Sequence, residues 1–107
     1  MGRAMKQLND LKLRQLEAKA GEAGRVLRLL ANERRLLILC QLAGGECAAG
    51  ALGEKAGLSQ SALSQHLAKM REEKLVTTRR EAQTVFYRIA DRRVAQLLTT
   101  LKDVFCR

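Results

Sequence analysis

Three cysteines are the side chains best suited to covalent or metal chemistry in this chain. They stand at positions 40, 47 and 106 of 107 residues, and the sequence has one histidine, His66. Three thiols do not form the disulfide framework of a small secreted domain. In a reducing compartment they are core residues, metal ligands or redox groups, and a metal site would need cysteine and carboxylate ligands. Because the sequence places no base beside a cysteine, we do not expect an enzyme.

A second group of side chains could read DNA. Apolar residues at Leu63, Leu67 and Met70 predict a helix over 59–73, and polar side chains occupy its opposite face. Glutamine and serine offer donors and acceptors to base edges in the major groove. His66 lies at the border of the apolar face, where a phosphate contact and a packing role are both open. The candidate DNA-binding residues of this helix are Gln60, Ser61, Ser64, Gln65, His66 and Lys69.

Two short segments follow in which β-branched and aromatic residues are common. Residues 75–80 and 84–90 are typical of strands, and a polar link at 81–83 joins them as a hairpin. Arg79, Arg80 and Gln83 lie near its tip and suit a phosphate or minor-groove contact. A hairpin or a polar helix face would each, in isolation, be no more than a solvated surface. Their order in one basic chain favours DNA binding.

The elements that must position these residues are mostly helices. Helical spacing predicts helices over 4–30, with a break possible at Gly21 and Gly24, and over 33–43 after an Asn32 cap. A short helix over 48–55 and the helix over 59–73 form a helix-turn-helix, the hairpin at 75–90 forms a wing, and a last helix follows Asp91. The expected fold is mainly α with a small β-hairpin: one winged helix-turn-helix domain over 1–107. The apolar stripes of the helices at about 4–30 and 91–106 predict a homodimer interface.

Charge and composition restrict the function classes. Lysine and arginine number 20 against 11 acidic residues, a net charge of +9 with a pI near 10.2. A polyanion partner is the simplest interpretation. Hydrophobic residues make up 47% of the chain, which is too many for a disordered basic tail. No segment is typical of a membrane span or a signal peptide, so we expect a cytoplasmic protein that does not bind membranes.

Three segments of the chain resemble the ArsR/SmtB family of winged-helix repressors. They are residues 31–40 (ANERRLLILC), 58–67 (LSQSALSQHL) and 77–87 (TTRREAQTVFY). The likeness covers about residues 20–107. It implies a homodimer that binds double-stranded operator DNA under the control of an inducer, which in the family is usually a metal ion.

The metal sites of that family are missing here. Ala48 and Gly50 stand where the arsenic and cadmium sensors have a Cys-x-Cys pair. The zinc sensors use aspartate, histidine and glutamate on the last helix, whereas this helix has Asp91, Asp103 and no histidine. We therefore expect no metal and no cofactor.

The positions of Cys40 and Cys106 instead resemble the BigR/SqrR/YgaV/HlyU-like dithiol subgroup. That resemblance implies a redox switch in which persulfides, other reactive sulfur species or oxidants join the two thiols by a disulfide or polysulfide bridge and DNA binding falls. Lys102 lies one turn before Cys106 and favours its thiolate. Cys47 has no counterpart in the pattern.

Two alternatives remain open at this point. One is a metal- or haem-responsive regulator of the same fold that uses Cys47 with another ligand. The other is an anti-silencing DNA-binding protein that acts without an inducer.

Overall fold

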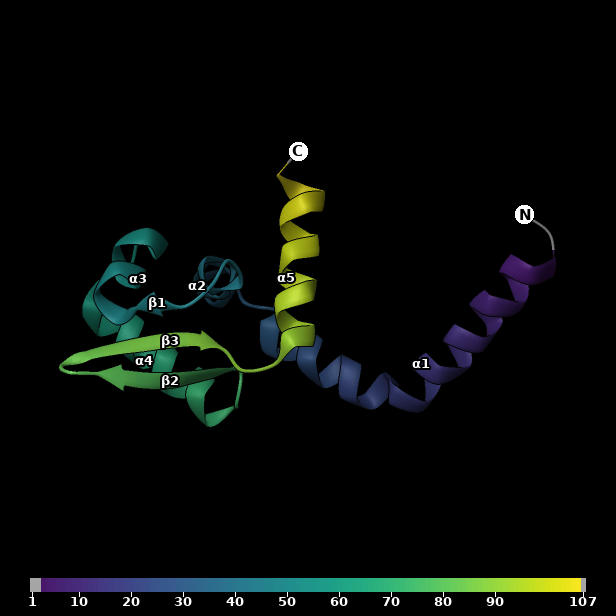
Figure 1. Cartoon of the computed structure of the whole chain (residues 1–107), viewed down its shortest axis with the longest axis horizontal. Coiled ribbons are helices and arrows are strands. Elements are labelled where there is room, and N and C mark those ends of the chain that lie inside the picture. The colour runs from purple at the N-terminus through teal and green to yellow at the C-terminus, as the bar shows by residue number, and fades with distance from the viewer. Residues whose placement is uncertain (1–2, 107) are drawn as a thin grey trace. The chain divides into compact units, whose positions relative to one another are not determined.

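A computed structural model describes residues 3–106, with side chains from residue 9 onwards. Residues 1, 2 and 107 of the predicted domain lie outside this range. The described residues form two compact units, which divide between Ala31 and Asn32. The elements in order are α1 (Arg3–Leu30), α2 (Glu33–Ala43), β1 (Cys47–Ala48), α3 (Ala49–Ala56), α4 (Gln60–Glu72), β2 (Val76–Glu81), β3 (Thr84–Ile89) and α5 (Arg92–Phe105) (Figure 1).

The first unit is the single helix α1. It continues through Gly21 and Gly24, so the break considered there is absent. Its leucines at 11, 13, 16 and 27 are all more than half exposed. An amphipathic helix with an exposed apolar stripe needs a further surface to cover that stripe.

Three helices of the second unit begin at the predicted caps. Asn32 accepts a hydrogen bond from the N–H of Arg35 at 3.0 Å, Ser59 from that of Ala62 at 3.2 Å, and Asp91 from that of Arg93 at 2.8 Å. Each bond satisfies an amide that the helix itself leaves without a partner. Local sequence therefore fixes where these helices start.

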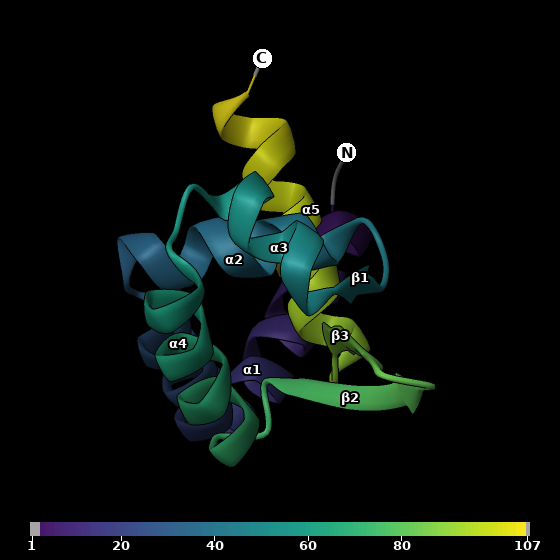
Figure 2. The same cartoon turned by 90° about the vertical axis from the view of Figure 1, so that its left-hand side faces the viewer.

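The core of the second unit lies around α2, which packs against α3, α5 and β3. The predicted apolar side of α4, formed by Leu63, Leu67 and Met70, is buried. The other fully or nearly fully buried apolar side chains of this unit are Ile38, Leu39, Leu42, Leu52, Leu75, Val76, Val94 and Leu98. Figure 2 shows α4 beside the sheet, with α2 and α3 above it.

The predicted hairpin is present and has an additional strand beside it. β2 and β3 pair antiparallel from Val76 opposite Ile89 to Glu81 opposite Thr84, so only Ala82 and Gln83 form the turn. Two residues that were expected at or beside the start of α3 form β1 instead, with Cys47 opposite Tyr87. The sheet order is β1-β3-β2, and the hairpin extends well beyond β1 (Figure 1).

Candidate nucleic-acid interface and dithiol site

The polar face of α4 is exposed as the helical wheel predicts. Gln60, Ser61, Ser64, Gln65 and Lys69 are all exposed, and Ser61, Ser64 and Gln65 lie on the side away from the buried leucines. Gln60, seven residues before Leu67, lies at the border of the apolar face. These exposed side chains can therefore enter a groove of DNA without disturbing the core. His66 is half-buried at the border of the apolar face, so both of its predicted roles remain compatible with its place.

Gln60 also makes a contact with α3. Its Nε2 donates to the carbonyl oxygen of Gly50 at 3.5 Å. A Cβ at Gly53 would lie 2.6 Å from the same nitrogen, so only glycine leaves room for this placement. Gly53 was not singled out from the sequence. The available signal was a glycine inside a short helix, where it costs helix stability and often has a packing reason.

Arg79 is held by two carboxylates on the wing. Its Nε and Nη2 donate to Glu46 at 2.7 Å each, and its Nη1 donates to Glu81 at 2.9 Å. The guanidinium also lies 4.4 Å from the centre of the Phe86 ring. The hydrogen bonds from Arg79 lower the pKa of Glu46, and those to the carboxylates raise the pKa of Arg79. Glu46, 33 residues from Arg79 in sequence, was not among the predicted site residues.

Arg80 lies on the opposite face of β2. Successive side chains of a strand point to opposite sides, and Arg80 stands opposite Val85 whereas Arg79 stands opposite Phe86. Arg80 and Gln83 are exposed near the turn. The structure thus places the two neighbouring arginines on opposite faces of the wing.

Cys40 and Cys106 come from two elements that pack together. Cys40 is half-buried on α2, and Cys106 is exposed at the end of α5, where its N–H donates to the carbonyl oxygen of Lys102 at 2.9 Å. Burial raises the pKa of the Cys40 thiol; the positive charge of Lys102 lowers it, and the charge of Cys106 raises it further. Both thiols are free. The packing of α2 on α5 thus brings together the two elements that hold these thiols, although 65 residues separate the thiols in sequence.

Cys47 has a different setting. It is only 8% exposed on β1, and its Sγ lies 4.0 Å from the Nζ of Lys55 on α3. This neighbour was not foreseen, because nothing in the sequence relates the two positions. Within the described part of the chain, no three His, Cys, Asp or Glu side chains gather where they could hold a metal ion.

Comparisons with known proteins agree with this architecture. Residues 32–78 match the family described as "Bacterial regulatory protein, arsR family". Transcriptional activator HlyU of Vibrio cholerae is 44% identical over 97 residues, which cover 91% of this chain and 90% of the relative.

Solved structures give the same result. The transcriptional repressor BigR from Xylella fastidiosa superposes with a TM-score of 0.79 at 36% identity, covering 88% of this chain and 96% of that one. The homodimeric winged helix-turn-helix DNA-binding domain Mb0332 from Mycobacterium bovis gives a TM-score of 0.67 at 38% identity, with 82% of each chain covered. Across residues 3–106, no helix has the length and apolar character needed to cross a membrane. The helix-turn-helix, the wing and these relatives together show that the chain belongs to the ArsR family of winged helix-turn-helix transcriptional regulators.

Proposed function

We propose that this regulator is a dimeric repressor whose affinity for operator DNA is switched by the Cys40/Cys106 dithiol. Reactive sulfur species or oxidants are the inducer. The reduced protein binds DNA, and the cross-linked protein releases it. The observation that carries the proposal is the packing of α2, which holds Cys40, against α5, which ends just before Cys106, with both thiols free.

The exposed face of α4 and the wing are the proposed DNA-contacting surface. Glutamine and serine on α4 read base edges, and the cations contact phosphates. The wing face that carries Arg80 contacts DNA directly, whereas Arg79 must first exchange a carboxylate for a phosphate. The proposed contacts are Gln60, Ser61, Ser64, Gln65, His66, Lys69, Arg79, Arg80 and Gln83.

Exposed apolar side chains support a homodimer. On α5, Val94 and Leu98 are buried, while Leu97, Val104 and Phe105 remain 41%, 54% and 79% exposed. Leucines of α1 are exposed in the same way. Large apolar side chains grouped on one helix face typically mark an interface. A relative of the same fold is a homodimer, and two copies would place two α4 helices on two half-sites of an operator.

The chemistry of the switch needs one nucleophile and one resolving thiol. Cys106 is exposed, so its thiolate attacks the outer sulfur of a persulfide, R–S–SH, and R–S⁻ leaves as the thiolate. The product is a persulfide on Cys106. The Cys40 thiolate then attacks the Cys106 sulfur, hydrosulfide leaves, and a disulfide joins α2 to α5. The two protein thiols lose two electrons in total, which reduce the persulfide to a thiol and hydrogen sulfide. If a second R–S–SH first converts Cys40 to a persulfide as well, the outer sulfur of that persulfide attacks the inner sulfur of the Cys106 persulfide, hydrosulfide leaves, and a trisulfide bridge forms.

A bridge would affect DNA binding through the helices that it joins. α2 packs against α3 of the helix-turn-helix and against α5, whose exposed apolar face we assign to the dimer. Cross-linking α2 to α5 favours the arrangements that satisfy the bond. If these arrangements change the separation of the two α4 helices, the oxidised dimer no longer matches its half-sites.

The test combines intact mass with DNA binding. The reduced protein is first used to select a DNA duplex from a random-sequence library. The protein is then titrated into this duplex before and after it has been treated with a persulfide donor. We expect loss of binding in step with a Cys40–Cys106 link. Cys40→Ser and Cys106→Ser should each bind DNA and lose the response, and the matched control Cys47→Ser should keep it. Undiminished binding by quantitatively linked protein would refute the switch.

A further inference from the structure

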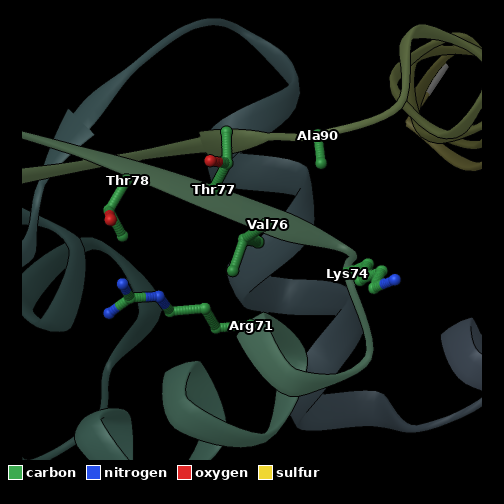
Figure 3. A pocket seen from close by; sticks show the side chains of 6 residues that line it. All are labelled: Arg71, Lys74, Val76, Thr77, Thr78 and Ala90. Atoms are coloured by element: carbon green, nitrogen blue, oxygen red, sulfur yellow. The ribbon is translucent and has the colours of Figure 1, made fainter.

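A groove opens between the C-terminal end of α4 and strand β2. Its volume is about 410 Å³, and Figure 3 shows the side chains that line it. Four of them can donate hydrogen bonds, and none is acidic. The lining residues are Arg71, Lys74, Val76, Thr77, Thr78 and Ala90.

The two cations of this groove are available to a ligand. Across the side chains that the structure describes, Arg71 and Lys74 form no ion pair, whereas Arg35, Arg79 and Arg93 each hold a carboxylate. Arg71 extends beneath β2 on the side to which Thr78 points, and Lys74 lies at the other end of the groove (Figure 3). An unpaired guanidinium close to a hydroxyl is well suited to an anionic oxygen ligand.

The groove continues the candidate reading face of α4. At about 100° per residue, Ser61, Ser64 and Arg71 fall within an arc of about 80° on the exposed side of this helix. The serines lie toward the N-terminal end and Arg71 in the last turn. A strand of DNA that follows this face therefore passes from the serines to the groove.

The other wall of the groove continues toward the wing. Val76, Thr78 and Arg80 share one face of β2, because alternate residues of a strand point to the same side. Val76 is buried at the base, and Arg80 is exposed near the tip. The groove is therefore the place where the polar face of the helix and the cationic face of the wing meet.

We infer that this groove binds one backbone phosphate of the DNA, in the stretch between the bases read by α4 and the segment contacted by the wing. The inference rests on the proposed DNA-binding function and deepens it. Arg71 and Lys74 supply positive charge, and the hydroxyl of Thr78 donates a hydrogen bond to the phosphate. Such an interaction positions the protein on the duplex and is independent of base sequence.

The salt dependence of DNA binding tests this assignment. The Arg71→Gln/Lys74→Gln double variant is compared with the wild type on a mixed-sequence duplex of about 30 base pairs, long enough for two half-sites. If each protomer no longer neutralises one phosphate, the slope of log K against log salt should fall by about 1.8 per dimer. Between 50 and 200 mM salt, the double variant should then lose ~12-fold less affinity than the wild type. The change in slope should be equal on the selected duplex.

Controls separate this inference from general charge and from folding. Arg25→Gln/Arg28→Gln removes the same two charges from exposed positions of α1 and should leave the slope unchanged. Arg71→Lys/Lys74→Arg keeps both charges and should show the wild-type slope. This result would distinguish a phosphate interaction from damage to the fold. A double variant with the wild-type slope would overturn the inference while leaving DNA binding intact. A wild-type protein that binds no duplex would instead refute the proposed function.

Discussion

Arg35 on α2 and Glu73, the C-cap residue that follows α4, form an ion pair through two hydrogen bonds. Arg35 Nη1 lies 2.9 Å from Glu73 Oε2, and Nη2 lies 3.3 Å from Oε1. The side chains are only 11% and 21% exposed, so solvent weakens the pair less than it weakens the wing pairs. One helix thus carries Cys40, the proposed sensor thiol, and is also linked by this ion pair to the end of the helix that we assign to DNA reading.

Glu73→Gln should weaken this link. The amide keeps the size of the carboxylate but loses its charge, so a weaker neutral hydrogen bond replaces the ion pair with the partly buried Arg35 guanidinium. We expect the free energy of unfolding in urea to fall by about 1–2 kcal/mol. The response of DNA affinity to persulfide should shrink as well if the Arg35–Glu73 ion pair couples the proposed bridge on α2 to α4.

The exposed neighbour Arg34 provides a matched control. Arg34→Gln should change neither the unfolding free energy nor the persulfide response appreciably. If Glu73→Gln lowers stability but keeps the full response, the ion pair is structural and does not transmit the switch.

The three thiols should differ in reactivity. Alkylation requires a thiolate and access to solvent. Cys106 is exposed, Cys40 is half-buried with a raised pKa, and Cys47 is buried on β1. Timed alkylation followed by peptide mass spectrometry should therefore modify Cys106 first, then Cys40, and Cys47 last.

Lys102 tests the electrostatic part of this order. Its positive charge lowers the pKa of Cys40, so Lys102→Gln should raise that pKa further and slow alkylation of Cys40 several-fold at neutral pH. The rate should recover as the pH rises, because deprotonation then no longer limits it. Arg92→Gln, at the far end of α5, should leave the rate unchanged. Equal rates in both variants would mean that Lys102 does not act on this thiol.

Glu46 holds Arg79, one of the proposed DNA contacts, and would compete with a phosphate for its guanidinium. Replacing it in Glu46→Gln removes one of the two carboxylates that hold the guanidinium, so affinity for a mixed-sequence duplex should rise a few-fold at low salt. Glu17→Gln on α1 removes the same charge elsewhere and serves as the control. A fall in affinity relative to that control would indicate that Glu46 orients Arg79 toward DNA.

The same pair should add a pH dependence to stability. The pKa of Glu46 is lowered in the folded protein. Ionised Glu46 therefore contributes fully to folding stability at a pH above the ordinary glutamate pKa, and this contribution is lost as the pH falls through the lowered pKa of the folded state. Thermal midpoints measured from neutral to acidic pH should therefore converge for wild type and Glu46→Gln at the acidic end. High salt should reduce the difference at neutral pH, since both groups are exposed.

Local signals in the sequence predict most of the fold. The caps at Asn32, Ser59 and Asp91 and the apolar spacing of α4 are confirmed, because each depends on residues a few positions apart. Strand β1 was missed, since two residues after a glycine pair have no periodicity. The pairing of Arg79 with Glu46 was missed for another reason: it depends on β1 lying beside β3.

The candidate site divides in the same way. The exposed polar face of α4 follows from a helical wheel, whereas the proximity of Cys40 and Cys106 follows only from tertiary packing of α2 on α5. In the sequence, their pairing was an implication of family resemblance and not of any pattern within the chain. The phosphate groove was missed because its walls, the end of α4 and β2, meet only in the folded domain.

Gly53 should control the orientation of Gln60 with little effect on stability. In Gly53→Ala the new methyl group would lie 2.6 Å from Gln60 Nε2 and 3.3 Å from Leu63 Cδ2, so the Gln60 amide must move away from Gly50. Alanine favours the helix by up to about 1 kcal/mol, which offsets the local crowding, and the net change in stability should stay within about 1 kcal/mol.

Affinity for the selected duplex should fall by about tenfold, which corresponds to removing one base interaction of the kind that glutamine makes. Affinity for mixed-sequence DNA should stay unchanged, because the phosphate interactions are untouched. Gln60→Ala should lower the affinity for the selected duplex by a similar factor. The double variant Gly53→Ala/Gln60→Ala should bind this duplex only slightly more weakly than Gln60→Ala alone. If Gly53→Ala also weakens mixed-sequence binding, it displaces α3 against α4, and Gly53 serves the packing of the two helices more than the placement of Gln60.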